Sequence, residues 1–393
     1  MAPAQPSQAD APVSYRVADP GTFAVAKALL EDGTGLVGAA GGPLPDDAEL
    51  RAIHRAMLTT RLMDERLLKL QRQGRVAFVG TATGLEAAIH GSAAAFAPRD
   101  WMFSALREGG AAMQRGMPVD EYVAHMFGNA EDTAKGRQMP NHFQCREVNF
   151  ASWSSVIGTQ LPHAVGAALA FRKRGGDAVA CAYAGDGATS SNGFHSALNF
   201  AAVMRAPVVF VVIDNGWAIS VPSSEQTAAR SYGVKARAYG MPGVDVDGND
   251  ALACYRETAR AVARARADAG PSLVCLRTYR LGGHSSSDDP SRYRDPAEFE
   301  YWERRDPLPR IEAWLATRGL LDAAGRDALA AEIQDHIAAA VRRAEALGPP
   351  ELESLIEDVY ADPPPALRRQ VIEALRIVAE KGAAEAVAGR FPL

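Results

Sequence analysis

Two stretches decide the fold of this chain: Gly185-Asp186-Gly187-Ala188-Thr189 and Asp214-Asn215-Gly216-Trp217-Ala218-Ile219-Ser220. Each follows an apolar, strand-like run, 178–184 before the first and 208–213 before the second. Between the two strands, apolar residues recur at helical spacing over 194–202. The order strand, loop, helix, strand predicts a parallel βαβ unit. Its polar loops lie at the carboxyl ends of the strands, where open α/β sheets bind ligands.

The residues in these loops suit a magnesium ion and a diphosphate. Asp186 offers a carboxylate and Asn215 an amide oxygen, and Mg²⁺ prefers such oxygen ligands together with diphosphate oxygens. Gly185 and Gly187 let the backbone approach a ligand closely, and the amino end of the next helix attracts phosphate. A lone Gly-Asp-Gly is also common in ordinary turns, so two tight turns without a ligand remain the alternative.

Composition indicates an ordinary globular protein. The 393 residues are 47% hydrophobic and 23% charged, which provides ample material for a buried core. A net charge of −5 indicates neither nucleic acid nor a membrane surface as a partner. The four cysteines are far apart, which argues against a metal-binding pair and fits a reducing cytoplasm. Residues 1–15 lack the pattern of a signal or transit peptide, and no apolar run is long enough to span a bilayer.

The chain divides into three regions: a flexible N-terminal extension over 1–44, an α/β domain over 45–325 and a helical C-terminal region over 326–393. The fold class we expect is a doubly wound, mostly parallel sheet with helices on both faces. Two long polar segments, 131–150 and 282–296, interrupt the pattern, and long loops commonly carry functional residues.

Residues from about 45 to 380 resemble the α subunit of the heterotetrameric, thiamin-diphosphate-dependent 2-oxoacid dehydrogenases. The most discriminating stretch is Thr278-Tyr279-Arg280-Leu281-Gly282-Gly283-His284-Ser285-Ser286-Ser287-Asp288-Asp289. Its double Asp, with Tyr301-Trp302 downstream, is most similar to the branched-chain (2-oxoisovalerate) branch. The resemblance implies the thiamin-diphosphate-binding fold. Other stretches that carry it are Gln71-Arg72-Gln73-Gly74-Arg75, Gly136-Arg137-Gln138-Met139-Pro140, Thr159-Gln160-Leu161-Pro162 and Val246-Asp247-Gly248-Asn249-Asp250.

The resemblance also implies cofactors and roles, position by position. Mg²⁺ would be held by Asp186, Asn215 and the main-chain carbonyl of Trp217, and His284 and His142 would serve catalysis. A structural potassium ion, present in some relatives, would lie at Ser154, Thr159 and Gln160. The residues expected to bind thiamin diphosphate are Arg107, Ser155, Ile157, Gly185, Asp186, Gly187, Ala188, Asn215, Trp217, Arg280 and His284.

Three positions depart from the family pattern. Leu106 stands where relatives usually carry a Tyr that touches a phosphate, Ile213 replaces a common Arg, and Asp214 replaces the first Asn of the amide pair. The first two changes remove phosphate contacts, each worth roughly 1.5–3 kcal/mol when a charged group is involved. Weaker cofactor binding, or a different phosphate arrangement, is therefore expected.

The implied reaction is the oxidative decarboxylation of a branched-chain 2-oxoacid of the 3-methyl-2-oxobutanoate type. The acyl group would pass to a lipoyl-lysine arm of the acyltransferase component. In this family a Glu of the β subunit activates the cofactor, and nothing in this sequence marks a substitute, so we expect an α₂β₂ heterotetramer. Ser285 matches a serine phosphorylated in animal relatives, although that regulation is not inferred here. A pyruvate or acetoin dehydrogenase α subunit and a non-catalytic paralogue remain alternatives.

Overall fold

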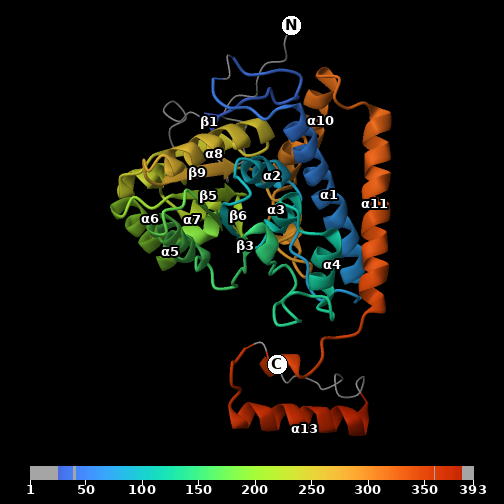
Figure 1. Ribbon diagram of the computed structural model, residues 1–393. Helices are drawn as coiled ribbons and strands as arrows, with labels where there is room; N and C mark the ends of the chain where they lie inside the picture. Colours follow the sequence, from blue (N-terminus) through green and yellow to red (C-terminus); the bar gives the residue numbers. More distant parts are fainter. Residues whose placement is uncertain (1–24, 39–40, 358, 383–393) are drawn as a thin grey trace.

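A seven-stranded, fully parallel sheet forms the centre of the computed structural model, which describes residues 25–38, 41–357 and 359–382 (Figure 1). The strand order is β1-β8-β9-β5-β4-β2-β3, and a short antiparallel pair, β6-β7, lies outside it. The predicted α/β fold with a mostly parallel sheet is confirmed. The strands are β1 (Val25–Ala26), β2 (Trp101–Phe103), β3 (Phe150–Ala151), β4 (Ala180–Gly185), β5 (Val208–Asp214), β6 (Trp217–Ala218), β7 (Val221–Pro222), β8 (Gly243–Asp247) and β9 (Ser272–Arg277).

Helices cover both faces of the sheet. The α-helices are α1 (Asp47–Arg72), α2 (Glu86–Ala94), α3 (Gly109–Gln114), α4 (Val119–Phe127), α5 (Gln160–Lys173), α6 (Asn192–Val203), α7 (Ser223–Gln226), α8 (Ala251–Arg266), α9 (Pro296–Glu303), α10 (Pro307–Thr317), α11 (Ala323–Ala346), α12 (Ser354–Glu357) and α13 (Pro365–Lys381). Short 3₁₀ turns include η4 (Arg146–Val148), η5 (Asp186–Ser190), η6 (Gly233–Tyr239) and η7 (Pro290–Arg292).

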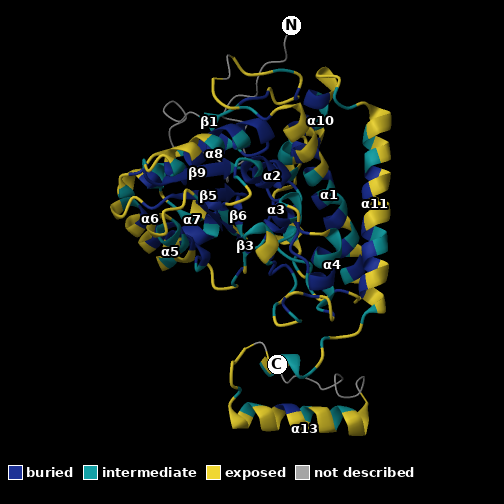
Figure 2. Ribbon diagram, in the orientation of Figure 1, coloured by how far each residue is buried: buried dark blue, intermediate teal, exposed yellow. Residues whose placement is uncertain are grey.

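Side chains of the central strands alternate between two separate cores. On β5, Val209 and Val211 pack with the helices α1, α2 and α8, whereas Val208 and Phe210 pack with α5 and α6. This period of two is the geometry of an extended strand, and burial on both faces explains why β5 reads as one continuous apolar run. Figure 2 shows the strands buried beneath helices whose outer faces are exposed.

Helix α1 begins at Asp47, directly after a capping residue. Asp46 caps it, accepting a hydrogen bond from the backbone N–H of Glu49, while the Glu49 side chain accepts one from the backbone N–H of Asp46. This reciprocal capping box satisfies two N–H groups that the helix leaves free. Leu50, Ile53 and Met57 then face the core at helical spacing.

Part of the region expected to be a flexible extension, 1–44, contacts the rest of the fold. β1 pairs with β8, and the backbone N–H groups of Ala28 and Leu29 both donate to the Asp250 carboxylate at 2.6 Å. The two donors are 221 residues or more from Asp250 in sequence. Local composition therefore could not indicate that this segment contacts the fold. Residues 1–24 of the expected extension lie outside the described residues.

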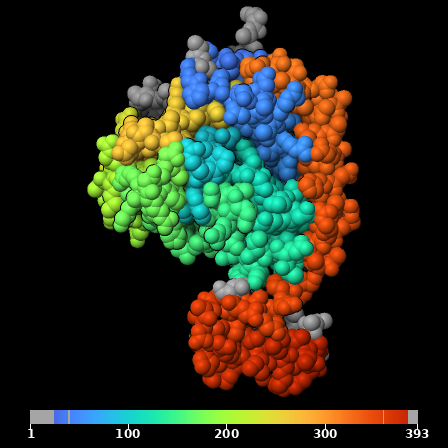
Figure 3. Space-filling model, in the orientation of Figure 1, coloured from blue at the N-terminus to red at the C-terminus, as the bar shows by residue number. Residues whose placement is uncertain are grey.

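The expected domain boundary at 325 falls inside α11 in the structure. This helix starts at Ala323 and buries Ile333, Ile337 and Val341 in the same core as α1. Beyond it, α13 buries only Val371, and Figure 3 shows the C-terminal segment as a lobe apart from the main body.

All four cysteines are buried free thiols, in line with the absence of paired spacing in the sequence. A search of the described residues found no helix that is both long and apolar enough to cross a membrane.

Candidate active site

The carboxyl ends of four neighbouring strands bring the predicted site residues to one edge of the sheet. Asp186 follows β4, Asn215 follows β5, Arg280 lies just beyond β9 and Arg107 just beyond β2. The strand order β9-β5-β4-β2 places these ends side by side. Backbone hydrogen bonds continue the alignment past the strands, since the N–H of Arg280 donates to the carbonyl of Asn215 at 3.1 Å. The predicted parallel βαβ unit of β4, α6 and β5 is confirmed.

Two buried carboxylates lie at the centre of this edge. The Ser223 hydroxyl is 2.9 Å from Oδ1 of Asp214 and 3.5 Å from Oδ2 of Asp186, so it bridges the pair. The amide oxygen of Asn215 accepts from the backbone N–H of Trp217 at 3.3 Å. Burial raises the pKa of Asp186 and, with the charge of Asp186 beside it, raises the pKa of Asp214 to about 7. A buried pair in which the charge of one carboxylate raises the pKa of the other suits a bound cation between or beside them.

Guanidinium groups gather next to the acids. Burial, together with the neighbouring charges of Arg280 and Arg294, lowers the pKa of Arg107 to about 10. Burial and the charge of Arg294 likewise lower the pKa of Arg280. The Nε atom of Arg280 is buried without a recorded partner among the described residues. A cluster of buried cations with a free donor fits an anionic group such as a diphosphate, which would stabilise all three charges.

Arg280 and Arg107 also hold the polar loop that carries His284. Arg280 donates to the carbonyl of Ile219 at 2.7 Å and to the Tyr293 hydroxyl at 2.9 Å. Arg107 donates to the His284 carbonyl at 2.8 Å and to the carbonyl of Thr81, and its guanidinium lies 3.3 Å from Nδ1 of His284. Burial and the charges of Arg107 and Arg280 lower the pKa of His284 to about 4, so its imidazole is neutral at pH 7.

Asp288 stabilises the loop that carries His284 through hydrogen bonds within the loop. Its Oδ2 accepts from the backbone N–H of His284 at 2.6 Å and from the Tyr293 hydroxyl. Tyr293 therefore links Arg280 to Asp288, and the loop is tied to the strand edge by side chains on both sides of His284. The sequence pattern did not identify Tyr293 or Asp288 as site residues. Their roles depend on the geometry of the loop, which the pattern does not specify.

His142 and Ser155 form a second group. Nε2 of His142 is 2.9 Å from the Ser155 hydroxyl, Nδ1 is 3.0 Å from the Gln138 amide oxygen, and the ring packs edge-on against Trp153. Ile157, by contrast, is 58% exposed, and no contact joins Ser155 or Ile157 to Asp186. Within the described chain, the residues expected around the aminopyrimidine thus form a separate, open part of the site.

The three residues expected at a potassium site lie at the start of α5. Gln160 donates to the carbonyl of Tyr183 at 2.8 Å, while its own amide oxygen is buried without a recorded partner. Ser154 accepts from the backbone N–H of Val156, and the N–H of Thr159 donates to the Val156 carbonyl. The unpartnered Gln160 oxygen is the one feature here that fits a bound cation.

Two of the three residues that depart from the family pattern, Ile213 and Leu106, have apolar side chains. Ile213 is 1% exposed and belongs to the core shared with α1, so its side chain packs rather than reaching a ligand. Leu106 is half-buried against Gly80.

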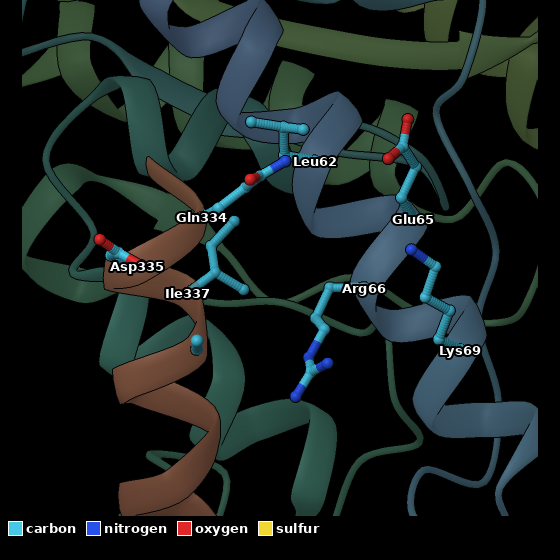
Figure 4. Close-up of a pocket in the computed structure, with 8 residues that line it drawn as sticks. Leu62, Glu65, Arg66, Lys69, Gln334, Asp335 and Ile337 are labelled. Atoms are coloured by element: carbon cyan, nitrogen blue, oxygen red, sulfur yellow. The ribbon is translucent and has the colours of Figure 1, made fainter. Parts of the chain in front are cut away.

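A separate cleft lies between α1 and α11 (Figure 4), and none of the predicted site residues lines it. Its lining residues are Leu62, Glu65, Arg66, Lys69, Gln334, Asp335, Ile337 and Ala338.

Comparison with known proteins gives a consistent result. Residues 54–353 match the family model "Dehydrogenase E1 component". The chain is 44% identical to the 2-oxoisovalerate dehydrogenase subunit alpha 2, mitochondrial, of Arabidopsis thaliana, over 81% of this chain and 68% of that protein. It is 42% identical to the 3-methyl-2-oxobutanoate dehydrogenase subunit alpha of Mycobacterium tuberculosis (strain CDC 1551 / Oshkosh), over 83% of this chain and 86% of that protein. For the Homo sapiens 2-oxoisovalerate dehydrogenase subunit alpha, mitochondrial, identity is 38% over 83% of this chain and 74% of that protein. Because the family match covers most of the chain and agrees with the strand-edge site, the chain belongs to the dehydrogenase E1 component family.

Proposed function

We propose that this chain is the α subunit of a branched-chain 2-oxoacid dehydrogenase. The reaction is the oxidative decarboxylation of 3-methyl-2-oxobutanoate and similar acids, with transfer of the acyl group to a lipoyl-lysine of an acyltransferase component. The observation that carries the proposal is that Asp186 and Asn215 lie with the cations Arg107 and Arg280 at one edge of the sheet. The similar proteins named as branched-chain 2-oxoacid dehydrogenase α subunits support it as well.

The opposed charges support thiamin diphosphate with Mg²⁺ as the cofactor. Asp186, Asn215 and the Trp217 carbonyl would hold the metal, and Arg107 and Arg280 would bind the diphosphate. Gly185, Gly187 and Ala188 would offer backbone to the same group. When bound, the cofactor's thiazolium supplies the electron sink that a 2-oxoacid needs in order to lose CO₂. A potassium ion near Gln160, with Ser154 and Thr159, is part of the same proposal.

His284 is placed to exchange a proton near the reacting atoms. Its imidazole is neutral at pH 7, since its pKa lies at about 4, and Asp288 fixes the backbone that carries it. An anionic diphosphate beside Arg107 and Arg280 would offset their charges and bring that pKa closer to the working pH. His142, held between Gln138 and Ser155, would act at the aminopyrimidine side, where Ser155 and Ile157 contact the cofactor.

A β subunit completes the site in this proposal. The side chains in contact with His142 and Ser155 are neutral, and no carboxylate is among these described partners. Ile157 and Val156 are 58% and 68% exposed, so a partner has room to cover them. A Glu of that partner would activate the cofactor within an α₂β₂ heterotetramer. We place the enzyme in the cytoplasm, where its four free thiols stay reduced.

The decisive experiment compares substrates in the assembled enzyme. The chain is co-expressed with its β subunit, and decarboxylation of 3-methyl-2-oxobutanoate and of pyruvate is measured with thiamin diphosphate and Mg²⁺. We expect the branched substrate to have the higher kcat/KM and the isolated chain to be inactive. A strong preference for pyruvate would replace this proposal with a pyruvate dehydrogenase α subunit. No turnover and no cofactor binding by the assembled protein would favour a non-catalytic paralogue, with Leu106 and Ile213 as the causes.

A further inference from the structure

We propose that Gln226 is a positioning residue for the metal site, holding the Asp186 carboxylate in the orientation that binds Mg²⁺. The inference rests on the proposed function, because it assumes that Asp186 is a metal ligand. Gln226 ends the four-residue helix α7, which the sequence analysis did not connect with the site.

Every hydrogen-bonding group of the Gln226 amide is engaged. Its Nε2 donates to Oδ2 of Asp186 at 2.7 Å and to the carbonyl of Val221 at 3.0 Å. Its Oε1 accepts from the Tyr232 hydroxyl at 3.3 Å. A primary amide has two N–H donors, and here one points at the carboxylate while the other is fixed by the chain. Two other hydrogen bonds, to the Val221 carbonyl and from the Tyr232 hydroxyl, therefore direct the amide towards Asp186.

The location of Gln226 supports a role at the metal rather than in packing. The side chain is half-buried, and its Oε1 lies 3.9 Å from the position that a Cβ on Gly187 would occupy. Ser223, one turn earlier on α7, contacts both Asp186 and Asp214. Helix α7 thus delivers two polar groups to the same pair of carboxylates, and only Gln226 donates to Asp186 at short distance.

The chemistry requires an amide at this position. A carboxylate in its place would accept but not donate, so it would repel Asp186 and leave the Val221 carbonyl without its partner. An apolar side chain of similar size would leave Asp186 free to rotate. Partners that orient a metal ligand in this way commonly change metal affinity by about 10- to 100-fold when they are removed.

The test is the Mg²⁺ dependence of thiamin diphosphate binding, measured by calorimetry on the assembled α and β chains. The variants are Gln226→Met and Gln226→Glu, with Ser224→Ala on the exposed side of α7 as the matched control. We expect Gln226→Met to raise the Mg²⁺ concentration needed for half-maximal binding about 10- to 100-fold, with binding restored at saturating Mg²⁺. We expect Gln226→Glu to raise it at least as far, and Ser224→Ala to leave it unchanged.

Two further measurements separate the possible failures. If Gln226→Met leaves the Mg²⁺ requirement unchanged while Asp186→Ala abolishes it, the positioning role is wrong and the metal site stands. If Asp186→Ala also leaves it unchanged, the proposed metal site itself is wrong. Should the Gln226 variants fail to fold, Tyr232→Phe removes only the hydroxyl that holds Oε1, and it is expected to raise the Mg²⁺ requirement severalfold. An unchanged requirement in Tyr232→Phe would overturn the inference.

Discussion

The two halves of the candidate site are built differently. The strand-end half, with Asp186, Asn215 and Arg280, is buried and tied to neighbouring backbone across the sheet. The other half, the segment from Ser155 to Ile157, is exposed and has few fixed contacts. A sheet edge can fix charged groups in advance, because the strands hold their carboxyl ends in register. An exposed segment acquires its final shape from what covers it. Under the proposed function, the buried half would bind the metal and diphosphate, and a partner would complete the exposed half.

Asp186→Ala should have the largest effect on cofactor binding at the strand-end half of the site. The change removes a buried carboxylate together with the hydrogen bonds that it accepts from Gln226 and Ser223. We expect thiamin diphosphate binding in the presence of Mg²⁺ to weaken by at least about 100-fold, the order of a lost buried charged contact of roughly 3 kcal/mol. Calorimetry on the assembled protein measures this. Asp335→Ala, at an exposed position on α11, is the matched control and should bind normally. Normal binding by Asp186→Ala would contradict the comparison.

Arg280→Met should weaken the diphosphate side by a smaller amount. It removes a cation that donates to the Ile219 carbonyl and to the Tyr293 hydroxyl, so both groups lose this donor. Loss of a charge-assisted contact worth roughly 1.5–3 kcal/mol corresponds to about 10- to 100-fold in cofactor affinity. The same titration, with Arg342→Met as an exposed control, checks the value. An unchanged affinity would mean that Arg280 holds only the loop.

Leu106→Tyr should strengthen cofactor binding at the strand-end half of the site. The half-buried Leu106 stands where the family resemblance places a phosphate-contacting Tyr, beside Arg107. A new hydrogen bond contributes about 0.5–1.5 kcal/mol, so we expect cofactor affinity to rise up to about tenfold. The apo protein should unfold at the same temperature as the parent. Weaker binding by the variant would show that the phosphates lie elsewhere in this chain.

The smallest expected effect is a pH dependence of stability through His284. Its folded-state pKa of about 4 lies below the ordinary value of 6.5, because burial and two guanidinium groups disfavour the imidazolium. The unfolded chain therefore binds more protons than the folded chain below about pH 6.5, and this group makes stability fall as the pH drops from there towards 4.

Thermal unfolding at pH 7 and pH 5 tests this effect. His284→Gln should lose less stability between the two pH values than the parent does, by less than about 1 kcal/mol, because solvent screens a half-exposed group. An equal loss in both proteins would mean that the imidazole titrates freely. Arg107→Gln removes one of the two cations and should also reduce the loss.

Periodicity and motif spacing were sufficient for the framework of this protein. The apolar run of β5, the helical spacing of α6 and the loops at the strand ends were all readable, because each depends on residues close in sequence. Contacts over long separations were not. The backbone N–H groups of Ala28 and Leu29 bind the Asp250 carboxylate, which is more than 200 residues away in sequence. The composition of the N-terminal segment alone predicts flexibility instead.

Within the site, the sequence by itself determined the chemistry: an acid and an amide after adjacent strands, and basic residues on a polar loop. Only the tertiary structure decided the orientation of those groups. It placed Gln226 on Asp186, used Tyr293 to join Arg280 to Asp288, and left Ile157 exposed. The physical reason is that a strand's local pattern fixes where its end emerges. The direction of a side chain beyond that end depends on hydrogen bonds to distant segments, which no local pattern records.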